Sequence, residues 1–362
     1  MSSLARDIPD TVENVVEDEE VWMDDGNTIV SVRSDDGVRL FKIHKSALSR
    51  QSSVFESMFT LPQGPAAGSE AYMGLPTVHL TDNHDDVKTL LMLLYTPMSL
   101  ASATRFRQST QDQLVGPLRL ATKYDMEELR REIISALVVE WPTTLEEWDL
   151  NEESIKTQFT SIEDQGEYWE MYHNRDFPSW TPDPIEILHI AQECDVPELL
   201  PAAFYHLNRS YHAAFKREDE YPDLFERTPR KALNTELLTP QDYHQLLIGR
   251  QMLAEHIRHY DFSYKLKLEQ EKLHRLNREP SESEMEARLK CVEAMNSYKN
   301  SYTFLRAVYS TGEDPLSELS VAMRAVPSIH QGACHACHRW VEMQLERLRE
   351  SVWVALEDFC KR

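Results

Sequence analysis

Apolar and polar residues alternate along residues 27–44, on either side of the polar tetrapeptide SDDG. Successive side chains of a strand point to opposite faces, so this alternation predicts two half-buried β-strands. Asp36 and Gly37 predict a tight hairpin turn between them, because both residue types tolerate the positive φ that such a turn requires. The second strand of this hairpin leads into the segment FKIHKSALSRQSSVFESMF, residues 41–59.

The spacing of the apolar residues changes to three and four directly after the hairpin, which is typical of a helix. Ser52 or Ser53 can begin the second half of this helical stretch, and Ser53 with Glu56 has the spacing of a capping box. One helical face collects the apolar side chains of the stretch: Ala47, Leu48, Val54, Phe55, Met58 and Phe59. A short strand at 77–80 and helices at 87–95, 111–123 and 126–139 follow, so the pattern predicts an α+β unit that ends near residue 140.

The pattern beyond residue 184 is helical to the end of the chain. It includes a helix that begins with Thr239 as its cap and Pro240 in its first turn, and a last helix at 339–360 with an apolar stripe. Residues 140–183 are acidic and rich in Trp and Tyr, which indicates an irregular connector. The expected organisation is therefore an acidic, disordered tail at 1–20, an α+β domain at 21–139, the connector at 140–183 and a mostly α-helical C-terminal domain at 184–362.

Composition narrows the classes of function. The net charge of −23 over 362 residues disfavours direct binding to nucleic acid, because the phosphate backbone is also negative. No stretch approaches the roughly 18 consecutive apolar residues that span a bilayer, so no membrane segment is expected. The acidic N-terminus lacks the apolar core of a secretory signal. With five cysteines, an odd number, the chain is expected to be intracellular, in the cytoplasm or nucleus, with reduced thiols or metal ligands.

The segment at 41–59 resembles the signature of the BTB/POZ fold. The residues that match its Phe-x-x-His-Lys-x-x-Leu…Ser-x-x-Phe-x-x-Met-Phe pattern are Phe41, Ile43, His44, Lys45, Leu48, Ser52, Phe55, Met58 and Phe59. The later segments VHLTDNHDDVKTLLMLLYT and LRLATKYDMEELRREIISAL resemble the strand and helices that follow in that family, so the resemblance covers residues 21–139. The remainder resembles the helical C-terminal region of a fungal, chiefly basidiomycete, group of BTB-domain proteins, for which no activity is implied.

This resemblance implies a non-enzymatic protein-interaction module that pairs with a second copy or docks onto a partner. His44 is then a buried, hydrogen-bonded structural residue, and no catalytic residue is expected. The homodimer interface is expected to draw on Trp22, Met23, Asn27, Ala47 and Leu48. Many relatives have an Asp where this chain has Asn27, close to the cation that is Lys45 here, and form a charged pocket. A substrate adaptor of a cullin-type ubiquitin ligase is the alternative, although the chain has no kelch repeats, zinc-finger array or basic tail.

The segment CHACHRW offers a second kind of chemistry. Cys334 and Cys337 have the spacing of a zinc-chelating pair, and the tetrahedron could be completed by Cys291, Cys360 or one of His330, His335 and His338. No second pair at zinc-finger spacing exists, so reduced structural thiols without a cofactor are the main expectation, and zinc binding is the alternative. A redox function of Cys334 and Cys337 is disfavoured, because redox Cys-x-x-Cys pairs begin a helix beside a βαβ sheet. Covalent haem attachment is excluded by the lack of an export signal.

Overall fold

The structure is a computed structural model. It forms two compact units, one made of Met1–Trp141 with Pro178–Val196 and the other of Pro142–Phe177 with Pro197–Arg362. In the part that the structure describes, no helix combines the length and the apolar character needed to cross a membrane. The described residues are 14–34, 37–61, 71–95, 110–163, 183–215, 233, 235–260, 281–309, 314–329 and 333–361.

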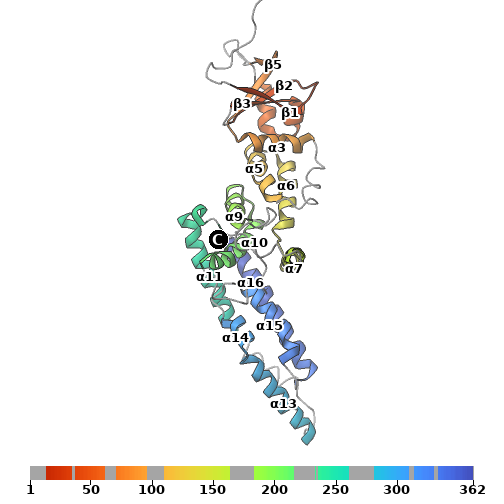
Figure 1. The fold of residues 1–362 in the computed structure, drawn as a ribbon, viewed down its shortest axis with the longest axis vertical. Helices are drawn as coiled ribbons and strands as arrows, with labels where there is room; N and C mark the ends of the chain where they lie inside the picture. Colours follow the sequence, from red (N-terminus) through yellow and green to blue (C-terminus); the bar gives the residue numbers. More distant parts are fainter. Residues whose placement is uncertain are drawn as a thin grey trace, which may run out of the picture. The chain divides into compact units, whose positions relative to one another are not determined.

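The described part of the N-terminal unit contains a five-stranded sheet of order β1-β3-β2-β5-β4 (Figure 1). The predicted hairpin is confirmed: β2 and β3 are antiparallel and in register from Thr28 opposite Ile43 to Ser34 opposite Gly37. Gly37, predicted to lie in the turn, is instead the first residue of β3, and Asp36 lies outside the described residues. Gly37 has φ +147°, and a Cβ at this position would lie 2.1 Å from the carbonyl oxygen of Asn14, so this position requires glycine. The strands are β1 Val15–Trp22, β2 Thr28–Ser34, β3 Gly37–Ile43, β4 Ala71–Tyr72 and β5 Leu75–Leu80.

Strand β2 lies at the centre of this sheet. It pairs antiparallel with β3 and parallel with β5, and its first five residues are all buried. Helix α3 packs against β2 and β1, and α5 packs against α3. Figure 1 shows α3 beneath the sheet, with α5 and α6 beyond it. The helices of this layer are α1 Lys45–Gln51, α2 Ser53–Thr60, α3 His84–Tyr95, α5 Thr110–Lys123 and α6 Glu127–Glu140.

Strand β1 corrects the expectation of a disordered tail at 1–20. Residues 15–22 pair with β3 in parallel, while residues 1–13 lie outside the described part. The composition of this strand is acidic and therefore resembles that of a disordered tail. Only one of its acidic residues, Asp18, is buried. Its carboxylate accepts hydrogen bonds from the backbone N–H groups of Glu20 and Val21, both at 3.1 Å, and lies 3.2 Å from the Lys88 ammonium.

Helix α9, Pro184–Glu193, also corrects the expected division, because it belongs to the N-terminal unit rather than to the C-terminal domain. The buried side-chain amide of Gln111, at the start of α5, forms two hydrogen bonds with Asp183, the N-cap of α9. Its Nε2 donates to the carbonyl oxygen of Asp183 at 3.0 Å, and its Oε1 accepts from the N–H of Asp183 at 3.1 Å. Arg119 of α5 forms an ion pair with Glu193 at 2.8 Å. These partners are about 70 residues apart in sequence, so periodicity cannot reveal them.

The C-terminal unit is helical in its described residues. The predicted cap of α11 is confirmed, since Thr239 and Asp242 form a capping box and Pro240 follows. The predicted apolar stripe of α16 is buried at Val341, Leu345, Leu348, Val352 and Leu356, and Phe359 is half-buried. The helices are α7 Leu145–Glu163, α10 Leu200–Phe215, α11 Pro240–His259, α13 Glu282–Lys299, α14 Tyr302–Tyr309, α15 Pro315–Ile329 and α16 His335–Cys360, with 3-10 turns at Pro197–Leu199 and Thr235–Leu237.

Helix α7 replaces much of the irregular connector expected at 140–183. Trp148 is buried, with its ring edge-on to Tyr205 at a centroid distance of 5.3 Å. The acids beside it are paired with arginines: Glu152 forms two hydrogen bonds to Arg209, and Asp149 forms two to Arg349. Three of the residues that suggested a connector, Trp148, Asp149 and Glu152, therefore fix this helix within the C-terminal unit, and residues 164–182 lie outside the described part.

We expect Asp18→Ala to lower the free energy of unfolding of the N-terminal unit by about 2 kcal/mol, because the backbone N–H groups of Glu20 and Val21 lose their acceptor and that of Val21 is buried. Urea denaturation of the full chain followed by circular dichroism measures this change. Glu19→Ala is the control, because Glu19 is exposed on the same strand. Equal unfolding midpoints for Asp18→Ala and wild type would contradict the role of Asp18.

The guanidinium of Arg209 is buried beside the Glu152 carboxylate. Burial disfavours the charge of this guanidinium, but the Glu152 carboxylate raises its pKa. Arg209→Leu leaves Glu152 without this partner and should destabilise the C-terminal unit by about 3 kcal/mol. The near-ultraviolet circular dichroism of the buried tryptophans reports the urea midpoint. The exposed Arg347 of α16 supplies the matched control Arg347→Leu, and an equal loss in both variants would refute the prediction.

Candidate functional site

The BTB-like signature residues form the junction between strand β3 and helices α1 and α2. Phe41, Leu48 and Phe55 are buried, each with an exposed fraction of at most 1%, whereas Met58 and Phe59 are half-buried. The Phe55 ring lies 4.7 Å from the Tyr124 ring and 6.1 Å from the Phe59 ring, measured between centroids. The signature therefore divides into side chains that fill the core and side chains that reach the surface.

Ser52 lies at the break between α1 and α2. Its hydroxyl accepts a hydrogen bond from Phe55 N–H at 3.1 Å, which caps α2. The same hydroxyl donates to the carbonyl oxygen of Tyr124 at 2.5 Å. One buried side chain thus caps a helix and connects it to the turn between α5 and α6.

His44 ends the predicted hairpin and is half-buried rather than fully buried, with 28% of its side chain exposed. Its backbone N–H donates to the Tyr95 hydroxyl at 2.9 Å, and its ring Nδ1 lies 3.1 Å from the same oxygen. Its Nε2 lies 3.1 Å from an Asp25 carboxylate oxygen. Burial raises the pKa of Tyr95, so this hydroxyl stays protonated at neutral pH. These contacts make His44 a link between the beginning of α1 and the end of α3.

The family model of the BTB/POZ domain matches residues 28–140, a range that contains the whole signature. The N-terminal unit contains a BTB/POZ domain. No curated protein and no solved structure matches the chain. The BTB/POZ domain has a small sheet covered by helices and is followed by a mostly helical C-terminal region. Strand β1 and helix α9 lie outside the matched range but pack within the same unit.

The expected interface residues of the BTB/POZ domain do not all reach its surface. Leu48 is 1% exposed, so assigning it to an interface is wrong: its position on the inner face of α1 is needed for the core. Trp22, Met23 and Ala47 are half-buried, and Asn27 is exposed. Only the latter four can contribute to a surface contact.

Hydrogen bonds hold the β1–β2 connection against the beginning of α1. Met23 N–H donates to the carbonyl oxygen of Lys42 at 2.8 Å, and the Asn27 carbonyl Oδ1 accepts from the backbone N–H of Lys45, also at 2.8 Å. The Lys45 ammonium lies 5.6 Å from the centroid of the Phe59 ring. Asn27 and Lys45 thus both make contacts within the domain, and the side chain of Asn27 orders the first turn of α1.

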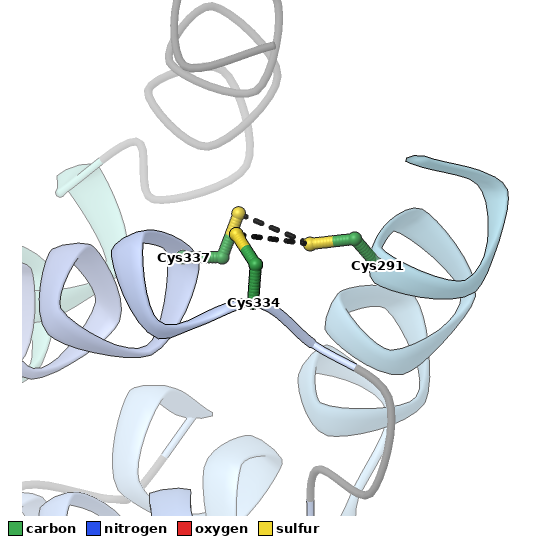
Figure 2. Close-up of side chains that lie close together, drawn as sticks. All are labelled: Cys291, Cys334 and Cys337. Atoms are coloured by element: carbon green, nitrogen blue, oxygen red, sulfur yellow. Dashed lines mark hydrogen bonds between the residues drawn. The ribbon is translucent and has the colours of Figure 1, made fainter. Parts of the chain in front are cut away.

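The structure brings together three of the four candidate cysteines, Cys291, Cys334 and Cys337, and the group does not include His335 or His338. Cys291 comes from the middle of α13, Cys334 is the N-cap of α16, and Cys337 lies in the first turn of α16 (Figure 2). Their sulfur atoms all lie within 4.8 Å of one another. Cys360 lies at the other end of the 26-residue helix α16 and outside this group, and His330 lies outside the described residues.

Several partners of these residues carry no signal in the sequence. Tyr95 and Asp25 position His44, and Tyr124 receives the Ser52 hydrogen bond, yet none belongs to a recognisable motif. Cys291 lies 43 residues before Cys334 without a neighbouring cysteine. Only the three-dimensional packing selects it over Cys360.

Ser52→Ala should destabilise the BTB/POZ domain by about 2 kcal/mol, because it removes the cap of α2 and leaves the Tyr124 carbonyl without its donor. The urea midpoint of the full chain measures the loss. Ser57→Ala, an exposed position on the same helix, should change the midpoint by less than about 0.5 kcal/mol. A Ser52→Ala protein as stable as Ser57→Ala would argue against this dual role.

Proposed function

We propose that the chain is a non-enzymatic interaction protein whose BTB/POZ domain pairs with a second copy of itself. A BTB/POZ domain is a protein-interaction module, and the family match is the observation that carries the proposal. The commitment of both His44 ring nitrogens to Tyr95 and Asp25 supports a structural rather than a catalytic role for that histidine.

The pairing surface that we propose comprises Trp22, Met23, Asn27 and Ala47. Trp22 supplies a large amphipathic ring, the kind of residue that dominates many protein interfaces. The hydrogen bonds from Met23 to Lys42 and from Lys45 to Asn27 hold the surface in place before binding, so little ordering entropy is lost on association. Phe59, beside Lys45 and half-buried, adds apolar area near the first turn of α1.

We also propose an intracellular setting, in the cytoplasm or the nucleus. All five cysteines have free thiols, which fits a reducing compartment. In such a setting the protein would meet its second copy without disulfide cross-links.

Ala47→Glu should convert the dimer to a monomer, because it introduces a charge into the proposed pairing surface while glutamate still favours the helix. Size-exclusion chromatography with light scattering on the full chain over a concentration series measures the mass, and circular dichroism verifies the fold. Val139→Glu is the matched control, since Val139 is 63% exposed on α6, and it should remain dimeric.

A wild-type protein that is monomeric at every concentration would refute the pairing, as would a folded Ala47→Glu variant that remains dimeric. A monomer that copurifies with a cullin would instead support the adaptor function.

A further inference from the structure

Three sulfur atoms from two helices meet in the C-terminal unit. Cys291 Sγ lies 3.2 Å from Cys337 Sγ and 3.8 Å from Cys334 Sγ. Figure 2 shows Cys334 and Cys337 pointing from the beginning of α16 toward Cys291 on α13. These distances exceed the roughly 2.05 Å of a disulfide, so the three thiols remain separate groups.

The separations match those between ligands of one tetrahedral metal ion. With Zn–S bonds of about 2.3 Å, two sulfurs of a tetrahedron lie about 3.8 Å apart. The distance from Cys291 to Cys334 has this value, and the 3.2 Å distance from Cys291 to Cys337 must widen by about 0.6 Å. Thiolates favour zinc over hard ions such as magnesium and calcium.

The position of the cysteines at the start of α16 also favours the negatively charged thiolate, which is the form that binds a metal cation. Cys334 is the N-cap of α16, where backbone N–H groups stabilise negative charge. Although burial opposes it, hydrogen bonds from Cys337 and from Ala336 N–H lower the pKa of the Cys334 thiol. Burial raises the pKa of Cys291 and of Cys337.

We propose that Cys291, Cys334 and Cys337 bind one zinc ion as a three-thiolate site. The metal replaces the proton of each protonated thiol, and the released protons pass to solvent. A water molecule occupies the fourth position, on the side of Cys334, which is exposed while Cys291 and Cys337 are buried. No electron transfer is involved, because zinc has no redox chemistry in proteins.

The site would fasten helix α13 to α16. Three of the described side chains of α13 are buried, Cys291, Met295 and Tyr298, and they form a narrow stripe on an 18-residue helix. The turns before Cys291 are mostly exposed. A helix with so little buried surface gains little from packing, so a metal cross-link at its first buried residue would contribute much of its attachment.

Cys334→Ser provides the most direct test, because it removes an exposed ligand and places a favoured N-cap residue at the start of α16. The full chain, expressed without a polyhistidine tag and purified with a phosphine reductant and no chelator, is analysed by mass spectrometry of metals. Wild type should contain about one zinc per chain, and Cys334→Ser should lose most of it. Cys360→Ser, a change of the same chemistry on the same helix, should retain the wild-type content.

A second readout does not depend on the metal acquired during expression. Cobalt added to the stripped, reduced wild type should produce the sulfur-to-cobalt charge-transfer absorption of a thiolate site, and this band should weaken strongly in Cys334→Ser. Stripping should also accelerate hydrogen exchange of residues 281–299 in wild type. Folded wild type without zinc and without the cobalt band would overturn the proposal, and so would a Cys334→Ser protein that binds both metals as wild type does.

Discussion

The burial of strand β2 along five consecutive residues is the constraint that organises the N-terminal unit. A strand buried in this way must have its backbone groups paired on both sides and its two faces covered. The hairpin partner β3 satisfies one side, β5 satisfies the other, and α3 packs against the strand. The BTB/POZ signature begins within β3 and continues into α1 and α2, since the chain must turn from this sheet into the helices that complete the core.

This constraint explains why the signature contributes to both the core and the surface. Phe41, Leu48 and Phe55 are used in the core, so changing them would unfold the domain before it affected a partner. The C-terminal unit contains polar groups in its interior. Arg209 and Arg349 form ion pairs with acidic residues of α7, and three thiols lie close together at the start of α16. Its internal order depends on polar contacts as well as on apolar stripes.

Local patterns in the sequence predicted the hairpin, the cap at Thr239 and the stripe of α16, because each depends on residues a few positions apart. Contacts between distant residues could not be predicted this way. Arg349 pairs with Asp149, 200 residues earlier, which turns an apparent connector into a docked helix. The structural roles of Asp18 and Gln111 likewise depend on partners that the local pattern does not indicate. For this reason the segments that contain or contact them, β1 and α9, lie in the N-terminal unit although the sequence pattern placed them elsewhere. For the same reason the sequence offered Cys291 and Cys360 as equal candidates.

Within this BTB/POZ domain, the residues that build the core and the residues that we propose meet a second copy are distinct sets. Hydrogen exchange of the full chain, compared at low and high protein concentration, tests this distinction most directly. We expect β2 to exchange slowly at both concentrations, and residues 22–27 and 45–49 to gain protection only at the higher one. Protection in these two segments that is independent of concentration, or rapid exchange in β2, would contradict the account.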